Sequence, residues 1–285
     1  MFKSLLSLLL ASTLSLGGIS TNQYNAFNET SLLSVASIPI KRAELVAPAA
    51  MSATAVIAID LDSQTILFKK NSDLKLPIAS LTKLMTAYIL LDEEDPDAMV
   101  TVSQNAASIS GSRMGLRSGE KISVKNLLYG LLIPSGNDAA VALAEYNSGT
   151  EKDFVKKMNA KAKLLGLDQT QYTNSTGLDS GESYSTTHDL ALLASYLIRD
   201  NTIRQIVNMK EAEVAGHKLE NTNTLLGQMG IKGIKTGRTD AAGECLVTLA
   251  ENAAGKEVLI VVLGSSNRFY DTKILLDWIY RAYIW

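Results

Sequence analysis

The sequence of 285 residues has a single cysteine, Cys245, and two histidines, His188 and His217. One cysteine cannot form a disulfide within the chain, and it cannot supply a cysteine-based zinc cluster. Two histidines likewise argue against a histidine-rich metal site. We therefore expect no metal and no cofactor, and hydrolysis assisted by a metal ion is disfavoured.

Neither sign of charge dominates, because 27 Lys and Arg stand against 29 Asp and Glu, a formal net charge of −2. The sequence pI is near 5.8 and positive and negative residues are mixed along the chain, so the sequence does not indicate a basic surface for binding nucleic acid. Repeats and low-complexity tracts are also lacking. With 46% hydrophobic and 20% charged residues, the composition excludes intrinsic disorder, collagen and a membrane protein of many spans.

The N-terminus has one positive residue, Lys3, followed by a run of apolar and small residues from Ser4 to Leu16. This layout is typical of a secretory signal, and the run is shorter than the roughly 20 residues that cross a bilayer. We expect residues 1–20 to be a signal peptide or N-terminal anchor, and residues 21–48 to be a linker with an ordered part near Lys41. An uncleaved leader would allow membrane association.

Strand patterns occur at both ends of the remaining chain. Residues 53–60 and 65–68 are rich in β-branched residues around a turn and predict a hairpin. Strand-like segments return at residues 233–237, 245–250 and 258–263. The turns between these last segments are too short for crossover connections, so antiparallel pairing is expected there.

The chain between these strands predicts helices joined by short loops. A first helical pattern begins at residue 80. Further helices are predicted at 124–133, at 138–146, from a Thr150 cap to Gly166, at 187–198 and at 270–283. The sequence therefore predicts an α/β fold. Its antiparallel sheet is assembled from distant segments and flanked by helices, with an inserted all-helical subdomain.

Ser80 and Lys83 place a hydroxyl and an amine one helical turn apart. A neutral Lys83 could accept the proton of Ser80. The same Ser-x-x-Lys spelling occurs at residues 72–75 and 118–121, so spacing alone does not select a nucleophile. Ser80 differs because it opens an apolar helix, where free N–H groups and the helix dipole favour a developing negative charge.

Two further short motifs could carry chemistry. Ser135-Gly136-Asn137 lies between two predicted helices, and a plain tight turn explains it equally well. Lys235-Thr236-Gly237 occurs once, on a predicted strand. Its lysine and hydroxyl suit a carboxylate and its glycine permits close approach, although a solvated strand end is the alternative.

In this order, the three motifs are close to the Ser-x-x-Lys, Ser-Asp-Asn and Lys-Thr-Gly set of β-lactamases and penicillin-binding proteins. From about Ala49 to Trp278 the chain resembles the serine D-alanyl-D-alanine carboxypeptidases, the low-molecular-mass penicillin-binding proteins. The resemblance is carried by residues 77–86, 174–178, 184–186, 233–237 and 242–245. It implies a serine β-lactamase/DD-peptidase-like fold, with residues 49–285 as a transpeptidase-like catalytic domain.

The resemblance implies that Ser80 attacks the carbonyl between two terminal D-alanines and forms an acyl-enzyme. Lys83 would be the base, and a relay through Ser135 is the usual rival. Neutrality of this lysine near pH 7–8 needs roughly 3–5 kcal/mol, expected from burial and from the charge of Lys235.

The remaining implied roles concern substrate binding. Asn137 would hold the substrate amide, and the backbone N–H groups of Ser80 and Arg238 would form the oxyanion hole. Lys235 and Thr236 would bind the terminal carboxylate, beside Gly237. Thr222 stands where some relatives carry an arginine, and Arg238 is the expected replacement for that charge.

The implied substrate is a peptidoglycan stem peptide ending in D-alanyl-D-alanine, with β-lactams as covalent inhibitors, outside the cytoplasm in the periplasm or cell wall. A D,D-endopeptidase remains the main alternative. A catalytically silent wall-binding module is less favoured, because a module that only binds has no need of the complete set of Ser80, Lys83 and Lys235. A β-lactamase is less favoured, because no Glu-x-x-Leu-Asn element lies between Ser135 and Lys235, and Gly136 replaces aspartate.

Three other features have ordinary structural explanations. His188 is expected in the first turn of a helix rather than in a Ser-His-Asp triad. Cys245 is expected to be a small buried hydrophobe on a strand. Trp278 and Trp285 are expected to pack a terminal helix rather than to contact a membrane.

Overall fold

The computed structural model describes residues 38–43, 47–178 and 183–285. The expected leader and most of the expected linker therefore lie outside the described residues. Among the described residues, no helix is both long enough and apolar enough to cross a bilayer.

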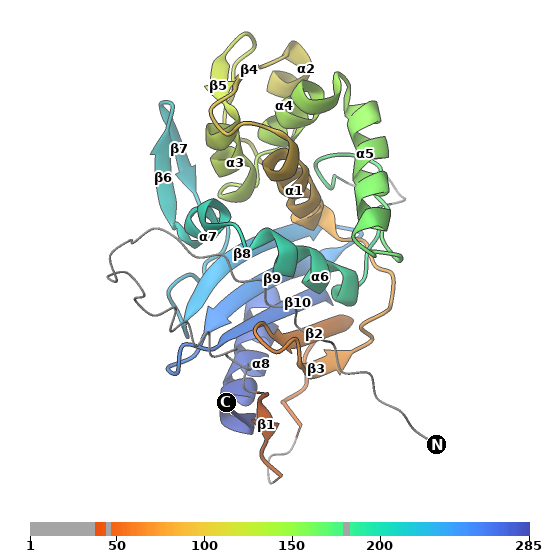
Figure 1. The fold of residues 1–285 in the computed structure, drawn as a ribbon, viewed down its shortest axis with the longest axis vertical. Helices are drawn as coiled ribbons and strands as arrows, with labels where there is room; N and C mark the ends of the chain where they lie inside the picture. Colours follow the sequence, from red (N-terminus) through yellow and green to blue (C-terminus); the bar gives the residue numbers. More distant parts are fainter. Residues whose placement is uncertain (1–37, 44–46, 179–182) are drawn as a thin grey trace, which may run out of the picture. The chain divides into compact units, whose positions relative to one another are not determined.

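A five-stranded antiparallel sheet organises the fold, with strand order β3-β2-β10-β9-β8 (Figure 1). Its strands are β2 (Ala55–Asp60), β3 (Ile66–Lys70), β8 (Ile231–Thr239), β9 (Gly243–Glu251) and β10 (Glu257–Ser265). The predicted hairpin is the β2–β3 pair, and the three C-terminal strands are antiparallel neighbours as predicted. Strand β10 also pairs with β2, which joins the two ends of the domain.

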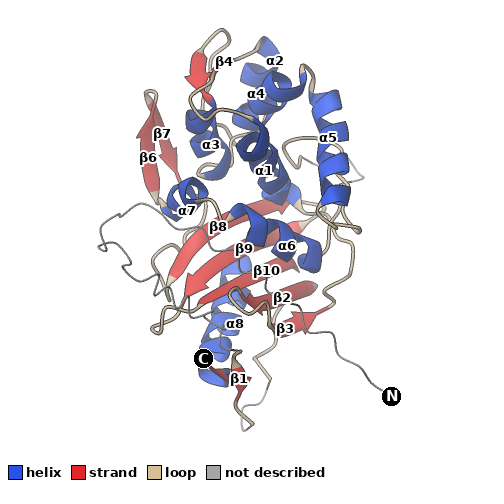
Figure 2. Cartoon of the chain, viewed as in Figure 1, coloured by secondary structure: helices blue, strands red, loops and turns tan. Residues whose placement is uncertain are grey.

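Both faces of the sheet are covered, so its inner strands read as apolar runs rather than alternating patterns. In β2 every residue is buried. Ile57 lies in one apolar cluster with the helix α6 (Thr187–Leu197), whereas Val56 lies in a second cluster with α8 (Arg268–Ala282). Successive strand residues point to opposite faces, so α6 and α8 cover the two sides of the sheet (Figure 2).

The inserted helical part contains the predicted helices and, in addition, a short helix at residues 104–108 that was not predicted. It contains the 3-10 turn η1 (Ala79–Thr82) and the helices α1 (Lys83–Glu93), α2 (Gln104–Ser108), α3 (Val124–Leu132), α4 (Asn137–Ser148) and α5 (Glu151–Leu164). The Thr150 side chain caps α5 by accepting from Asp153 N, as predicted. The first eight residues of α4 are all buried, which makes α4 a central helix.

Several elements were not predicted. The middle segment contains the short hairpin of β4 (Met99–Thr101) and β5 (Lys121–Ser123), and so is not purely helical. After α6 come α7 (Asn201–Asn208) and a hairpin of β6 (Glu211–Val214) and β7 (His217–Glu220). Strands of three or four residues with few or no buried side chains leave too short an apolar pattern to recognise.

The C-terminal aromatic residues pack the end of the domain, as predicted. The Trp278 ring meets Phe68 and Tyr283 edge-on, with ring centroids 6.0 Å apart in each pair. The Trp285 indole N–H donates to Asp60 at 2.6 Å. Next to them, β1 (Ile40–Lys41) pairs with β11 (Tyr283–Ile284).

Candidate active site

The 3-10 turn η1 holds Ser80 immediately before α1. Ala79 has a positive φ of 47°, a conformation that a non-glycine residue rarely adopts, so the chain turns sharply before Ser80. The Lys83 side chain is fully buried, and its Nζ lies 2.9 Å from Ser80 Oγ. Ser80 itself is partly exposed. The predicted nucleophile and base are therefore in hydrogen-bond contact, and the residue that carries the hydroxyl is not fully buried.

Two further oxygens fix the Lys83 amine. Its Nζ donates to Asn137 Oδ1 at 2.7 Å and to the Thr176 carbonyl at 2.6 Å. With Ser80 Oγ, these three acceptors match the three N–H bonds of an ammonium. A neutral amine can keep both oxygen contacts with its two N–H bonds, which leaves its lone pair facing the Ser80 hydroxyl.

Burial changes the proton affinity of both site lysines. It lowers the pKa of Lys83 from 10.5 to about 7, and the negative charge of Asp138 opposes this shift. Burial, followed by the charges of Lys83 and Arg268, holds the pKa of Lys235 well below its usual range, so the two buried amines disfavour each other's charged form.

The Ser135-Gly136-Asn137 motif forms the turn between α3 and α4. Ser135 has a positive φ of 65°, and its Oγ is buried without a hydrogen bond to any described residue. A Cβ on Gly136 would come within 2.8 Å of both Asp138 Oδ1 and the Gly130 carbonyl. A side chain at this position would therefore force its neighbours in this structure to move.

The Lys-Thr-Gly motif lies on β8, an edge strand of the sheet. Lys235 and Thr236 are buried, and Lys235 Nζ donates to the Thr236 carbonyl at 2.9 Å. A Cβ on Gly237 would lie 3.1 Å from Ser80 N, so glycine allows β8 to approach the turn that carries Ser80. Arg238 follows on the same strand and is exposed.

The other two Ser-x-x-Lys sequences do not form such a site. Ser72 Oγ donates to Asp73, and Lys75 Nζ lies over the Tyr184 ring, 4.9 Å from its centroid. Ser118 and Lys121 are both exposed. Of the three pairs, only Ser80 and Lys83 combine contact with burial of the amine.

Two contacts of the site were not predicted. Thr176 contributes a backbone carbonyl, which no side-chain motif encodes; the segment around it was recognised only through the family resemblance. Arg268, at the start of α8, donates from Nη1 to the Gly237 carbonyl at 2.9 Å. Thr222 Oγ1 lies 2.5 Å from Thr236 Oγ1, so Thr222 contacts the strand that carries the Lys-Thr-Gly motif.

The segment that carries Thr176 is held close to Ser80 by a glycine. Gly177 has a φ of 79°, and a Cβ there would come within 1.9 Å of the Ala79 carbonyl. We expect Gly177→Ala to destabilise the protein by about 3 kcal/mol, because backbone strain and a backbone clash add together. Thermal unfolding measures this loss.

Gly149→Ala is the matched control for this prediction. Gly149 has a similar φ of 76° but no atom within 4 Å of the added Cβ, so only the strain of about 1 kcal/mol applies. Equal losses of stability in the two variants would contradict the proposed contact between the two segments.

The other expected features are also visible. His188 lies in the first turn of α6 with an exposed ring, and its Nδ1 lies 3.6 Å from Asp189 Oδ1. The Asp189 carboxylate accepts hydrogen bonds from Gln169 N and Thr170 Oγ1. Cys245 is buried on β9, and burial raises the pKa of its thiol to about 11, unlike that of a nucleophile. Within the described ranges, no group of three or more His, Cys, Asp or Glu side chains could hold a metal ion.

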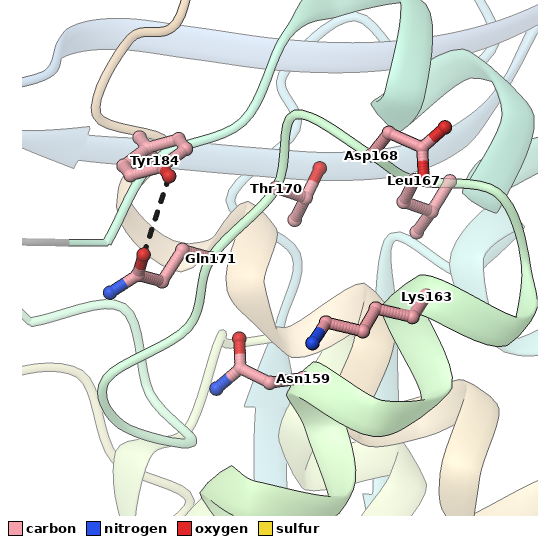
Figure 3. Close-up of a pocket in the computed structure, with 7 residues that line it drawn as sticks. All are labelled: Asn159, Lys163, Leu167, Asp168, Thr170, Gln171 and Tyr184. Carbon is pink, nitrogen blue, oxygen red and sulfur yellow. Dashed lines mark hydrogen bonds between the residues drawn. The ribbon is translucent and has the colours of Figure 1, made fainter.

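A cavity of about 660 Å³ lies at the C-terminal end of α5 (Figure 3). It is lined by Asn159, Lys163, Leu167, Asp168, Thr170, Gln171 and Tyr184. Tyr184 donates its hydroxyl to Gln171 Oε1 across one side, at 3.3 Å. None of the predicted site residues lines this cavity.

Comparison with known proteins gives consistent matches. DacF of Bacillus subtilis (strain 168), a D-alanyl-D-alanine carboxypeptidase, is 36% identical over 247 residues, which cover 82% of this chain and 64% of DacF. DacC of Escherichia coli (strain K12), with the same description, is 37% identical over 251 residues, or 62% of its length. The chain thus spans less than two thirds of these relatives.

A solved structure agrees in fold. A mutant of the Streptomyces K15 DD-transpeptidase superposes with a TM-score of 0.77 at 32% identity, covering 81% of this chain and 99% of that chain. The predicted DD-peptidase-like fold is therefore confirmed. The family model for D-alanyl-D-alanine carboxypeptidase, peptidase S11, matches residues 42–267. The chain belongs to the D-alanyl-D-alanine carboxypeptidase family, peptidase S11.

Proposed function

We propose that this protein is a serine D,D-carboxypeptidase, which removes the terminal D-alanine from peptidoglycan stem peptides through an acyl-enzyme on Ser80. The observation that carries the proposal is the buried Lys83 amine, with a pKa lowered to about 7, at 2.9 Å from the Ser80 hydroxyl. A lysine that is largely neutral near pH 7 can act as a general base at this distance. Family membership supports the same reaction.

In the acylation step, Ser80 Oγ attacks the carbonyl carbon while its proton passes to Lys83 Nζ. The carbonyl oxygen becomes an oxyanion, which accepts from the backbone N–H groups of Ser80 and Arg238. The proton then moves to the leaving nitrogen, and the C–N bond breaks to release D-alanine. Water hydrolyses the ester in the reverse sequence of proton transfers.

Ser135 is the candidate relay between Lys83 and the leaving nitrogen. Its buried Oγ makes no hydrogen bond within the described part of the chain, so the hydroxyl is free to accept and donate. Asn137 accepts from Lys83 through Oδ1 and donates one Nδ2 N–H to the Ser110 carbonyl, and we assign its second Nδ2 N–H to the substrate amide.

The terminal carboxylate would bind at β8, to Lys235 and Thr236. A carboxylate beside Lys235 favours the charged form, which opposes the lowering of its pKa by burial. Arg268 adds a second cation at this strand through its bond to the Gly237 carbonyl. Two cations and a hydroxyl then favour substrates with a free carboxyl end.

The lowered pKa of Lys83 predicts the pH dependence of acylation. Below about pH 7 the amine is an ammonium and cannot accept the Ser80 proton, so kcat/KM should rise with pH and level off above this midpoint. Acylation by a labelled penicillin, followed from about pH 5 to about pH 9, measures the profile. A profile that stays flat across pH 7 would contradict Lys83 as the base.

We place the reaction outside the cytoplasm, in the periplasm or cell wall. Support comes from the apolar run of residues 4–16 and from the location of peptidoglycan. If the leader is retained, the protein would be held at the outer face of the cytoplasmic membrane. Fractionation of cells that produce the full chain tests both statements.

One experiment separates the candidate activities. The full chain is incubated with labelled penicillin, with a pentapeptide ending in D-alanyl-D-alanine, and with cross-linked peptide dimers. A stable label with D-alanine release supports the carboxypeptidase, whereas cleavage of the dimers alone supports an endopeptidase. Rapid turnover of the penicillin indicates a β-lactamase. A folded protein that is inactive in all three assays indicates a wall-binding module and overturns the proposal.

A further inference from the structure

Asp138, the second residue of α4, is fully buried beside the proposed base. Its carboxylate accepts four backbone hydrogen bonds. Three come from the consecutive N–H groups of residues 114–116, at 2.8, 2.8 and 3.0 Å, and the fourth comes from Ala139 N at 2.9 Å. Each carboxylate oxygen accepts two of these bonds. The Asp138 side chain therefore fixes residues 114–116, at the end of a loop, against the start of α4.

The same loop orients Asn137. The Ser110 carbonyl accepts from Asn137 Nδ2 at 2.7 Å, and the Ser112 carbonyl accepts from Asn137 N at 2.7 Å. A Cβ on Gly111 would come within 2.7 Å of Asn137 Nδ2, so the loop lies directly against the amide. Because Nδ2 is occupied by the loop, Oδ1 is the atom that faces Lys83.

Asp138 also acts on the site through its charge. Its negative charge favours the protonated form of Lys83 and partly offsets burial. The other charged groups around the two residues are Lys235, whose own pKa the charge of Lys83 lowers, and Arg113, whose Nε lies 3.8 Å from Asp138 Oδ2. The Arg113 side chain is 41% exposed, so solvent weakens its influence.

We propose that Asp138 is a positioning residue of this active site: it ties residues 110–116 to α4, so that Asn137 presents its oxygen to Lys83, and it balances part of the lysine charge. The inference rests on the proposed function of Ser80 and Lys83. Asparagine cannot replace this carboxylate, because either orientation of its amide turns an NH₂ group toward two backbone N–H donors.

Asp138→Asn tests the proposal. We expect acylation by labelled penicillin to slow about 10²-fold, because a displaced Asn137 no longer holds the Lys83 amine in place. We also expect the midpoint of the pH profile to move to lower pH, because the ammonium loses a favourable charge. A residue that serves only folding would not move this midpoint.

Asp60→Asn is the matched control. Asp60 is also fully buried, and its carboxylate accepts from Ser63 N, Ser63 Oγ and Trp285 Nε1 at 2.5–2.8 Å. This variant should lose a similar amount of thermal stability, yet keep the acylation rate and the midpoint. Loss of acylation in both variants to the same degree would overturn the proposal.

Arg113→Gln provides a second variant in case Asp138→Asn does not fold. It leaves the carboxylate in place but removes a cation near it, so the midpoint should move slightly to higher pH. If the midpoint of the pH profile is unchanged in every folded variant of Asp138 and Arg113, the proposed effect of the Asp138 charge on Lys83 is overturned.

Titration of the Lys83 amine by NMR in the free protein measures the same midpoint without catalysis. Failure of the wild-type protein to acylate, with these NMR shifts present, would refute the proposed function alone.

Discussion

Ser80→Ala should abolish covalent labelling by penicillin and lower D-alanine release by about 10⁴-fold or more, because the variant lacks the hydroxyl oxygen that forms the ester. The remaining site should still bind substrate, since the Lys83 contacts to Asn137 and Thr176 do not involve Ser80. Mass spectrometry of the penicillin-treated protein and an assay of released D-alanine measure the two effects.

The chain supplies its own controls for this substitution. Ser72→Ala and Ser118→Ala change the first residue of the other two Ser-x-x-Lys sequences, whose lysines are exposed. Both variants should label like the wild type. Retained labelling in Ser80→Ala, or its loss in either control, would refute Ser80 as the nucleophile.

Lys83→Met should lower the acylation rate by about 10²- to 10⁴-fold, the range that a general base contributes. Methionine fills a similar volume but cannot accept the Ser80 proton, and it leaves Asn137 Oδ1 and the Thr176 carbonyl without their donor. The loss should persist at high pH, since no titrating amine remains. Single-turnover kinetics with labelled penicillin measure the rate.

Ser135→Ala distinguishes the two proton routes in the same assay. If Lys83 acts alone in acylation, removal of the Ser135 hydroxyl should slow the reaction less than Lys83→Met does. Equal losses would assign the relay to Ser135. A Lys83→Met variant with a wild-type rate would exclude the lysine from the mechanism.

Local patterns in the sequence were sufficient for most of the regular structure. The β-branched residues of β2, the apolar repeat of α3 and the Thr150 cap of α5 each depend on neighbours in the chain. The β6–β7 hairpin was missed because all but one of its residues are exposed or partly exposed, and such strands need no apolar alternation.

The candidate site could also be predicted from the sequence, because each of its short motifs places its side chains at a fixed spacing within one helical turn or one strand. Spacing could not rank the three Ser-x-x-Lys pairs, since all three are identical in that respect. The helix context and the family resemblance favoured Ser80. The structure adds the physical difference, which is that Lys83 is fully buried, whereas Lys75 and Lys121 are exposed.

The amino-acid sequence by itself determined the strands and helices, the candidate nucleophile and the family resemblance. Each of these depends on short motifs whose residues lie near one another along the chain. Only the tertiary structure decided the electrostatics. The lowered pKa of Lys83, its contact with the Thr176 carbonyl, and the position of Arg268 against β8 all depend on packing between distant segments. Burial and the direction of a backbone carbonyl are properties of the folded chain, and no spacing of residue types encodes them.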